Sequence, residues 1–205
     1  MRALSPTPLV AILRGVKPAD AEAIASVIVA AGFGAIEVPL NSLDPLRSIE
    51  TIARKWGNRT LVGAGTVLTP VEVDAVAGAG AKLVVAPNAD PAVIERAAKL
   101  GLTVLPGVAT PTEAFAALRV GASGLKLFPA ESLPPEIVRA WRSVLPKEVQ
   151  LFPVGGITPE RIQPYWKAGA DGFGIGSALY RPGAAADDVE RSAHAFVAAW
   201  RKANR

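Results

Sequence analysis

The segment Gly121–Ala130, "GASGLKLFPA", contains the pattern that decides the fold. A glycine is followed by a short step of small residues and then by an apolar run that ends at a proline. Glycine readily adopts the left-handed conformation in which helices often end. The apolar run is too short for a helix, so it indicates a strand that is buried on both faces.

The same pattern recurs along the chain. Four other stretches have it: "AGFGAIEVPL", "AGAKLVVAPN", "LGLTVLPGVA" and "AGADGFGIGS". Three further apolar runs, "PLVAILRG", "TLVGAGT" and "QLFPVGG", bring the expected strands to eight.

Helix starts are well marked between these strands. The segments Thr69–Glu72, "TPVE", and Thr110–Glu113, "TPTE", each combine a threonine cap, a proline at the first helical position and a glutamate that completes a capping box. Similar starts lie at Asp44, Asp90 and Thr158. Strands that alternate with capped helices predict a parallel sheet with helical crossovers.

Eight such units predict a single α/β domain over residues 1–205, folded as a (β/α)₈ TIM barrel. A doubly wound open sheet is the alternative. That fold usually has a glycine-rich turn after its first strand, where this chain has "ILRGVKP".

Composition excludes several classes of function. The 22 Lys and Arg residues outnumber the 18 Asp and Glu residues, but they are scattered apart from "WRKANR" at the C-terminus, so we expect no nucleic-acid partner. The chain has no cysteine, which excludes disulfides and fits a reducing compartment. It has no apolar run of 18 residues, and the apolar stretch before Arg14 is too short for a signal peptide. We therefore expect a cytoplasmic protein that does not bind membranes.

Catalytic groups of such barrels lie at the C-terminal ends of strands. The polar residues in these positions are Arg14, Glu37, Thr66, Asn88 and Lys126. In two of the strands a charged residue stands between aliphatic neighbours, as in "AIEVP" and "GLKLF". If the aliphatic faces pack on the helices, Glu37 and Lys126 both point into the barrel.

One carboxylate and one amine in an apolar interior suggest a particular chemistry. An ordinary lysine has a pKa near 10.4, so roughly one amine in two thousand is neutral at pH 7, and burial lowers that pKa. A neutral Lys126 can attack a ketone and form a Schiff base, which then acts as an electron sink, with Glu37 as the proton shuttle. The alternative is a structural ion pair between the two side chains.

Metal and serine chemistry find no support in the sequence. The one histidine, His194, lies in an expected helix, and no motif with metal-ligand spacing or serine-nucleophile pattern is present. We expect no metal site.

Two glycine-rich segments end the last two expected strands: Pro153–Glu160, "PVGGITPE", and Gly174–Tyr180, "GIGSALY". Phosphate groups in these barrels are commonly bound at this position by backbone N–H groups. The expected phosphate ligands are Gly155, Gly156, Gly176 and Ser177.

Seven motifs together resemble a known family. In chain order they are "LVAILRG", "AIEVPLNS", "GAGTVLTP", "VAPN", "LPGVATPTEAF", "LKLFPAE" and "PVGGITPE". They resemble the 2-keto-3-deoxy-6-phosphogluconate and -galactonate aldolases over roughly residues 8–182. The resemblance implies trimers of (β/α)₈ barrels, no cofactor, and cleavage of a phosphorylated keto-deoxy sugar acid to pyruvate and glyceraldehyde 3-phosphate.

The resemblance also implies roles for individual residues. Lys126 would form the Schiff base and Glu37 would be the acid and base. The implied substrate contacts are Arg14 and Thr66 at the carboxylate, Pro87 and Phe128 along the pocket, and Gly155, Gly156, Gly176 and Ser177 at the phosphate.

Two departures favour the galactonate branch of the family. The gluconate branch typically has an arginine in its second-strand motif, where this chain has "EVPLNS", and a threonine before the glycine pair, where it has Val154. A valine cannot hydrogen-bond the C4 hydroxyl, the one group in which the two substrates differ. The stretch "FPAESLPP" is closer to the gluconate branch, so a gluconate-specific or dual-specificity aldolase remains an alternative. The further alternatives are a sugar-phosphate epimerase or isomerase and a phosphate-binding barrel with an inert ion pair.

Overall fold

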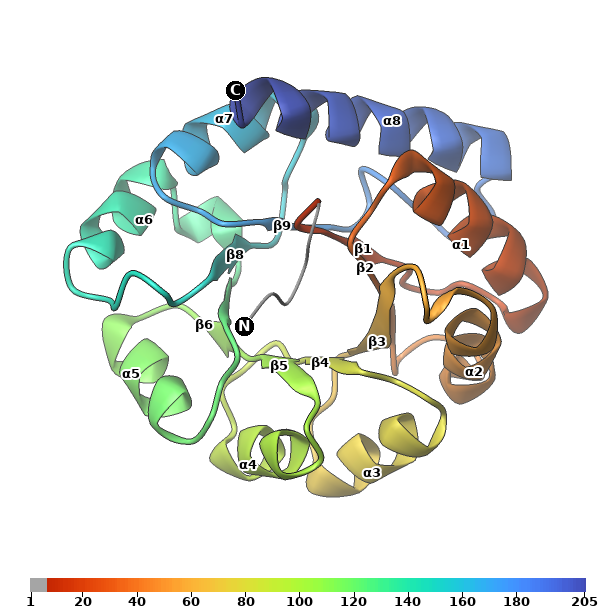
Figure 1. The fold of residues 1–205 in the computed structure, drawn as a ribbon, viewed down its shortest axis with the longest axis horizontal. Coiled ribbons are helices and arrows are strands. Elements are labelled where there is room, and N and C mark those ends of the chain that lie inside the picture. The colour runs from red at the N-terminus through yellow and green to blue at the C-terminus, as the bar shows by residue number, and fades with distance from the viewer. Residues whose placement is uncertain (1–6) are drawn as a thin grey trace.

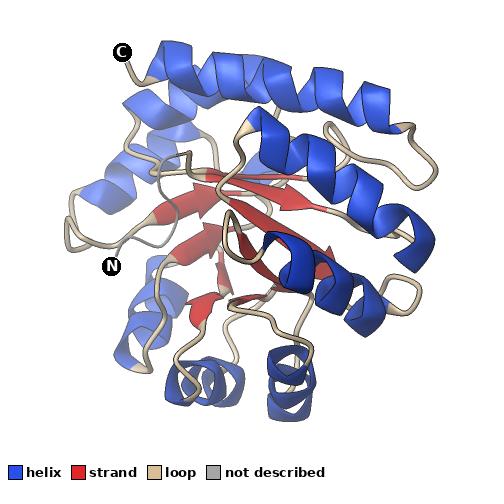
Figure 2. Ribbon diagram, turned by 45° about the vertical axis from the view of Figure 1, so that its right-hand side comes forward, coloured by secondary structure: helices blue, strands red, loops and turns tan. Residues whose placement is uncertain are grey.

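The structure is a computed structural model of the chain and describes residues 7–205. Residues 1–6, part of the stretch considered as a signal peptide, lie outside the described residues. Strands form an inner ring and helices lie around it, as Figure 1 shows from one end and Figure 2 from another angle. Within residues 7–205, no helix is long and apolar enough to cross a membrane.

Within residues 7–205, nine strand segments make up the interior. They are β1 (Leu9–Ile12), β2 (Ala35–Pro39), β3 (Leu61–Gly65), β4 (Leu83–Val85), β5 (Thr103–Leu105), β6 (Gly107–Val108), β7 (Leu125–Leu127), β8 (Leu151–Pro153) and β9 (Phe173–Ile175).

In the described part of the chain, eight α-helices and one short 3₁₀ helix, η1, follow the strands. They are α1 (Pro18–Ala31), α2 (Pro45–Trp56), α3 (Pro70–Gly78), α4 (Pro91–Lys99), α5 (Pro111–Arg119), η1 (Ala130–Ser132), α6 (Pro135–Arg142), α7 (Pro159–Lys167) and α8 (Ala186–Ala203).

All strand pairs are parallel and fall into two sheets. One has the order β5-β4-β3-β2-β1-β9 and the other the order β6-β7-β8. A single parallel bridge between Val154 and Gly174 connects the end of β8 to β9. This is an α/β fold with parallel strands covered by helices, as the sequence predicts.

The fifth predicted strand differs from the expectation. It is present as two pieces, β5 and β6, separated by Pro106 alone. β5 pairs with β4, whereas β6 pairs with β7. Proline has no backbone N–H to donate, so the hydrogen-bonded ladder is interrupted there and the strands divide into two sheets.

The predicted helix caps are largely present. Thr69 with Glu72 and Thr110 with Glu113 form complete capping boxes. Asp90 also caps its helix, because its side chain accepts hydrogen bonds from the first turn of α4. Asp44 and Thr158 make no side-chain cap, although each precedes a helix that begins with proline.

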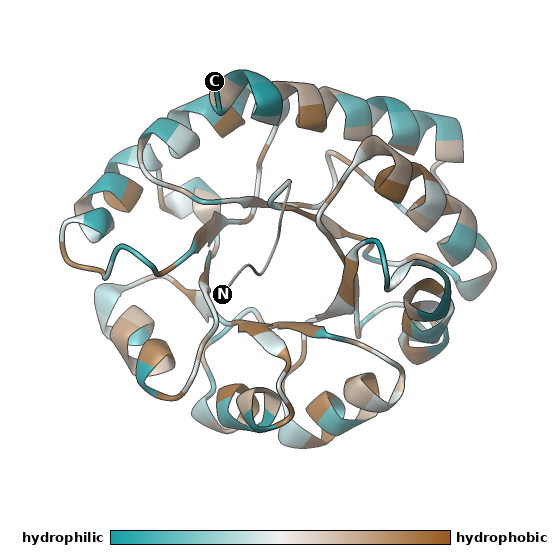
Figure 3. Cartoon of the chain, viewed as in Figure 1, coloured by the Kyte–Doolittle hydropathy of each residue, from teal (hydrophilic) through white to brown (hydrophobic). Residues whose placement is uncertain are grey.

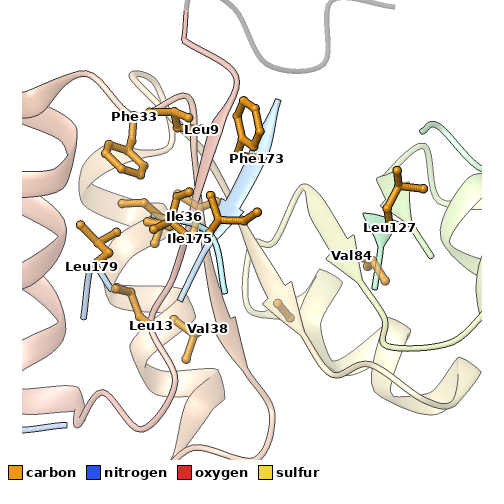
Figure 4. Close-up of a cluster of buried hydrophobic side chains, with 14 of the residues drawn as sticks. Leu9, Leu13, Phe33, Ile36, Val38, Val84, Leu127, Phe173, Ile175 and Leu179 are labelled. Carbon is orange, nitrogen blue, oxygen red and sulfur yellow. The ribbon is translucent and has the colours of Figure 1, made fainter. Parts of the chain in front are cut away.

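The hydrophobic core has two parts. The larger lies between the strands and the helices, and Figure 4 shows some of its side chains, including Ile36 and Val38 of β2. The helices turn their hydrophilic residues toward solvent (Figure 3). A smaller cluster fills the interior, with Val10, Leu83, Val85, Leu105 and Phe152 among its members. Residues that alternate with the outer face of β2 and β7 must therefore point into this interior.

Candidate active site

Glu37 and Lys126 meet inside the ring of strands. Glu37 on β2 is 2% exposed and Lys126 on β7 is 7% exposed. Both line a small cavity of about 10 Å³ whose other walls are apolar, including Val85 and Phe152. The structure thus brings together the two groups that the strand alternation predicts to face inward.

The Lys126 amine lies in a dry environment. Its Nζ is 4.4 Å from the centroid of the Phe128 ring. Burial lowers the pKa of Lys126; the Glu37 charge opposes this effect, and the Arg14 charge adds to it. Burial is the largest of these causes, because an ammonium loses its hydration in an apolar site. A lowered pKa increases the fraction of neutral, nucleophilic amine.

The pKa of the Glu37 carboxyl lies near neutral pH. Burial raises the pKa of Glu37 from 4.5 to about 7, against the opposing charges of Lys126 and Arg14. Its Oε2 is buried without a hydrogen-bond partner. Among the ion pairs of residues 7–205, none joins Glu37 to Lys126. The two side chains are therefore near each other but not locked together, which disfavours a purely structural ion pair.

A glycine of the neighbouring strand makes room for the carboxyl group. A Cβ atom on Gly65, at the end of β3, would lie 2.0 Å from Glu37 Oε2. Side-chain atoms cannot approach so closely, so the inward position of the carboxyl depends on the bare backbone of Gly65.

A second, larger cavity of about 570 Å³ adjoins the first. Ile12 and Val154 line both cavities, so the two spaces share a wall. The larger cavity is also lined by all four predicted phosphate ligands: Gly155, Gly156, Gly176 and Ser177.

The two glycine loops present free backbone to this cavity. Gly155 and Gly156 have φ angles of 112° and 58°, values that glycine adopts without strain. In the described part of the chain, the N–H groups of Gly156 and Ser177 have no partner within the protein. Arg181, which follows the Ser177 loop, lines the same space. Free N–H groups beside a cation favour an anion such as phosphate.

Other predicted residues lie around the cavities. Arg14 lines the larger cavity, and its Nη1 donates a hydrogen bond to Asn41 Oδ1. Thr66 follows β3 with a left-handed φ of 57°, which is uncommon for a β-branched residue. Thr66, Pro87 and Phe128 line neither cavity, although Phe128 contacts the Lys126 amine through its ring. The backbone carbonyl of Asn88 accepts a hydrogen bond from the Gly107 N–H.

Two charged residues of the larger cavity carried no predicted role. Arg181 donates its Nε to the Ser177 carbonyl at 3.3 Å, and Glu131 lies against the glycine pair. Glu131 is the last residue of the motif "LKLFPAE", and Arg181 directly follows "GIGSALY". Extending the second motif by one residue would have found Arg181, whereas Glu131 was in a quoted motif but was given no role.

Over residues 7–205, no group of three or more His, Cys, Asp and Glu side chains could hold a metal ion. His194 lies on α8, and its side chain is mostly exposed.

Comparisons with known proteins agree on one family. A family model described as KDPG and KHG aldolase matches residues 2–193. The chain is 49% identical to a probable 2-dehydro-3-deoxy-6-phosphogalactonate aldolase of Rhizobium meliloti (strain 1021), over 94% of this chain and 91% of that protein. It is 47% identical to the 2-dehydro-3-deoxy-6-phosphogalactonate aldolase of Escherichia coli (strain K12), over 96% of each chain. A solved structure described as native KDPGal superposes with a TM-score of 0.97 at 46% identity, covering 100% of this chain and 99% of that one.

Proposed function

Because the chain belongs to the KDPG and KHG aldolase family, we propose that it is a class I aldolase acting on 2-dehydro-3-deoxy-6-phosphogalactonate. It cleaves this substrate to pyruvate and glyceraldehyde 3-phosphate. The observation that carries the proposal is the buried and unpaired Glu37 and Lys126, in a cavity that adjoins a larger one with anion-binding character.

The reaction begins at the Lys126 amine. The neutral Nζ attacks the C2 ketone of the substrate, and loss of water from the adduct leaves a protonated imine. Glu37, whose pKa is raised to about 7, supplies the proton that departs with the hydroxyl group and is left as a carboxylate.

Bond cleavage follows from the positive imine nitrogen. The Glu37 carboxylate removes the proton of the C4 hydroxyl as the C3–C4 bond breaks, and the bonding electrons move into the imine to give an enamine. Glyceraldehyde 3-phosphate leaves. Glu37, protonated in the cleavage step, gives this proton to C3 of the enamine. Addition of water to the resulting protonated imine releases pyruvate and the neutral Lys126 amine, and the proton set free returns to Glu37.

The two ends of the substrate bind different parts of the site. Gly155, Gly156, Gly176 and Ser177 bind the phosphate through the free N–H groups of their loops. Arg14, which Asn41 orients, and Thr66 bind the carboxylate of the pyruvyl portion. Pro87 and Phe128 border the pyruvyl end, in keeping with the contact between the Phe128 ring and Lys126.

Val154 selects the C4 epimer. It lines both cavities, so it lies beside the substrate atoms between C2 and the phosphate. Its isopropyl group cannot hydrogen-bond a C4 hydroxyl, and the galactonate epimer directs that hydroxyl elsewhere. We expect kcat/KM to be at least about tenfold higher for the 6-phosphogalactonate substrate than for its gluconate epimer. Side-by-side initial rates with both epimers measure this, and equal or reversed rates would contradict the assignment.

The chemical test is covalent trapping of Lys126. Borohydride reduction in the presence of pyruvate should add one reduced pyruvyl group to the peptide that contains Lys126, as read by mass spectrometry. The Lys126→Arg variant retains a positive charge but cannot present a neutral amine, so it should show neither trapping nor turnover. Trapping at a different lysine would refute the assignment.

The whole chain, residues 1–205, acts as one domain and a closed barrel. Support comes from the single residue, Pro106, between β5 and β6 and from the Val154–Gly174 bridge between β8 and β9. The protein assembles as a homotrimer through exposed apolar residues that follow β2 and β3, namely Leu43, Leu68 and Val71. Its phosphorylated substrate is retained inside cells by charge, which places the reaction in the cytoplasm.

A further inference from the structure

Behind the Gly155–Gly156 turn lies a circuit of hydrogen bonds that the proposed reaction does not use. Arg161 Nη1 donates to the Gly156 carbonyl at 2.7 Å, and Arg161 Nη2 donates to the Tyr165 hydroxyl oxygen at 3.1 Å. Both residues belong to α7. Neither lines the larger cavity, so they contact the turn from outside the space of the predicted phosphate.

The circuit continues to the end of the strand that carries Lys126. The Tyr165 hydroxyl lies 2.8 Å from the Ala130 carbonyl oxygen and 3.0 Å from that of Leu133, and these two acceptors share its one proton. The Ala130 N–H in turn donates to the Val154 carbonyl at 2.9 Å. The Val154 and Gly156 carbonyls, on either side of Gly155, are therefore both connected by hydrogen bonds to the segment that follows β7.

The location of Tyr165 makes this circuit firm. The residue is only 1% exposed, so its hydroxyl cannot replace these partners with bulk water. A buried polar group that loses its partner costs more than an exposed one, which favours retention of the whole circuit.

Arg161 also acts on the electronic character of the turn. In a trans peptide the Gly156 carbonyl and the Ile157 N–H point in opposite directions. A cation bound to the carbonyl therefore aims the N–H away from Arg161, and it polarises the peptide so that the N–H becomes a stronger donor. Ile157 lines the larger cavity, where such a donor would meet an anion.

We propose that Arg161 and Tyr165 are positioning residues that set the phosphate affinity of the Gly155–Gly156 turn and connect it to the Lys126 strand. This inference rests on the proposed function. The guanidinium supplies charge without touching the substrate, and Tyr165 holds it in place.

The test compares Arg161→Gln and Tyr165→Phe with the wild-type protein. The matched control is Arg139→Gln, which removes the same charge from α6, where no hydrogen bond or ion pair of Arg139 is found within residues 7–205. Three quantities are measured for each: the Kd for inorganic phosphate, KM and kcat with the 6-phosphate substrate and its non-phosphorylated analogue, and the rate of pyruvate trapping at Lys126.

Arg161→Gln should weaken phosphate binding and raise KM for the phosphorylated substrate about tenfold, because it removes a charge-assisted hydrogen bond. Its kcat/KM with the non-phosphorylated analogue and its trapping rate should stay within about twofold of wild type. Tyr165→Phe should change the same quantities about threefold, and the double variant should be no worse than Arg161→Gln, since one circuit is broken in both. Arg139→Gln should match wild type.

Equal losses on both substrates, or unchanged phosphate affinity in Arg161→Gln, would overturn the proposal. Arg161→Lys serves where the glutamine variant fails to fold, because a single ammonium cannot bridge both acceptors in the geometry of a guanidinium. If the wild-type protein itself were not trapped by pyruvate, the proposed function would fail, while the phosphate Kd values would still decide the role of Arg161.

Discussion

Burial shifts the pKa values of Glu37 and Lys126 in opposite directions. It raises the pKa of Glu37 to about 7 and lowers that of Lys126, so the two values approach each other. A proton can then pass between the substrate and either group at small cost near neutral pH. The apolar walls around these residues are thus part of the chemistry, because they cause both shifts.

The Glu37→Gln variant tests this at a single residue. Above about pH 7 the wild-type Glu37 has lost the proton that it supplies to the departing hydroxyl group, so kcat/KM should fall as the pH rises above that value. The variant cannot accept a proton at any pH, and its kcat should be about 10²- to 10³-fold lower. Full pH–rate profiles of both proteins measure the effect.

The same variant should move the pH dependence of pyruvate trapping. The Glu37 charge raises the pKa of Lys126, so its removal should lower that pKa further and shift the trapping profile to lower pH. A shift to higher pH would contradict the electrostatic coupling.

The raised pKa of Glu37 also makes the stability of the folded protein depend on pH. Because its pKa is higher in the folded state than in the unfolded state, Glu37 contributes stability below pH 4.5 that is lost as the pH rises toward about 7. The variant should therefore be no less heat-stable than wild type at pH 8.

At this scale, the sequence predicted which side chains face inward but not every residue of the site. Glu37 and Lys126 could be placed because strand alternation is a local rule. Arg181, in a loop, and Glu131, in the short helix η1, were missed because the path of such connecting segments depends on the elements they pack against.

Elements set the distances between these residues. β3 contributes no catalytic side chain in its strand, yet the absence of a Cβ on Gly65 gives the Glu37 carboxyl its position. In the parallel pairing of β2 with β3, Glu37 lies opposite Gly63 and Pro39 lies opposite Gly65. Gly65 is therefore two residues closer to the C-terminal ends of the strands than the residue opposite Glu37.

Gly65→Ala should therefore impair catalysis without a comparable loss of fold. The added methyl would lie 2.0 Å from Glu37 Oε2, so the carboxyl must turn away from its present place. We expect kcat to fall at least about tenfold, with a loss of heat stability smaller than that of a core deletion. Steady-state kinetics and thermal melting measure the two effects. A variant with normal kcat would show that the observed carboxyl position is not required.

Predictability of the elements follows the range of the interactions that form them. The capping boxes at Thr69 and Thr110 were correctly predicted, because the motif is contained in four consecutive residues. Thr158 and Asp44 have similar local sequences but no side-chain cap. The division at Pro106 was not predicted, because it depends on which neighbours β5 and β6 pair with.

Seen as a whole, the described part of the molecule leaves several large apolar side chains exposed, and three of them follow the adjacent strands β2 and β3. Val71, at the start of α3, is 76% exposed, and Leu43 and Leu68 lie in the segments that follow the adjacent strands β2 and β3. Exposed apolar groups that gather in one area often mark a contact with another protein chain. Composition alone cannot locate this area, since the exposure of a residue depends on the final packing.

The Val71→Glu variant tests whether this surface joins subunits. Light scattering should find wild-type protein at about three times the mass of the chain and the variant at a lower mass, because a buried unpaired carboxylate destabilises an interface. Thr112→Glu, on the first turn of α5, adds the same charge at another exposed position and should leave the mass unchanged. If the Val71→Glu protein were still a trimer, this surface would not be part of the subunit interface.

Ile12 and Val154 form a shared wall between the small cavity of about 10 Å³, which contains Lys126, and the larger cavity of about 570 Å³. Run in the synthetic direction, such a catalyst would be strict about its donor ketoacid and tolerant of its acceptor aldehyde. The choice of unnatural aldehydes for carbon–carbon bond formation would then be changed by mutating residues of the larger cavity alone, without altering the nucleophile Lys126.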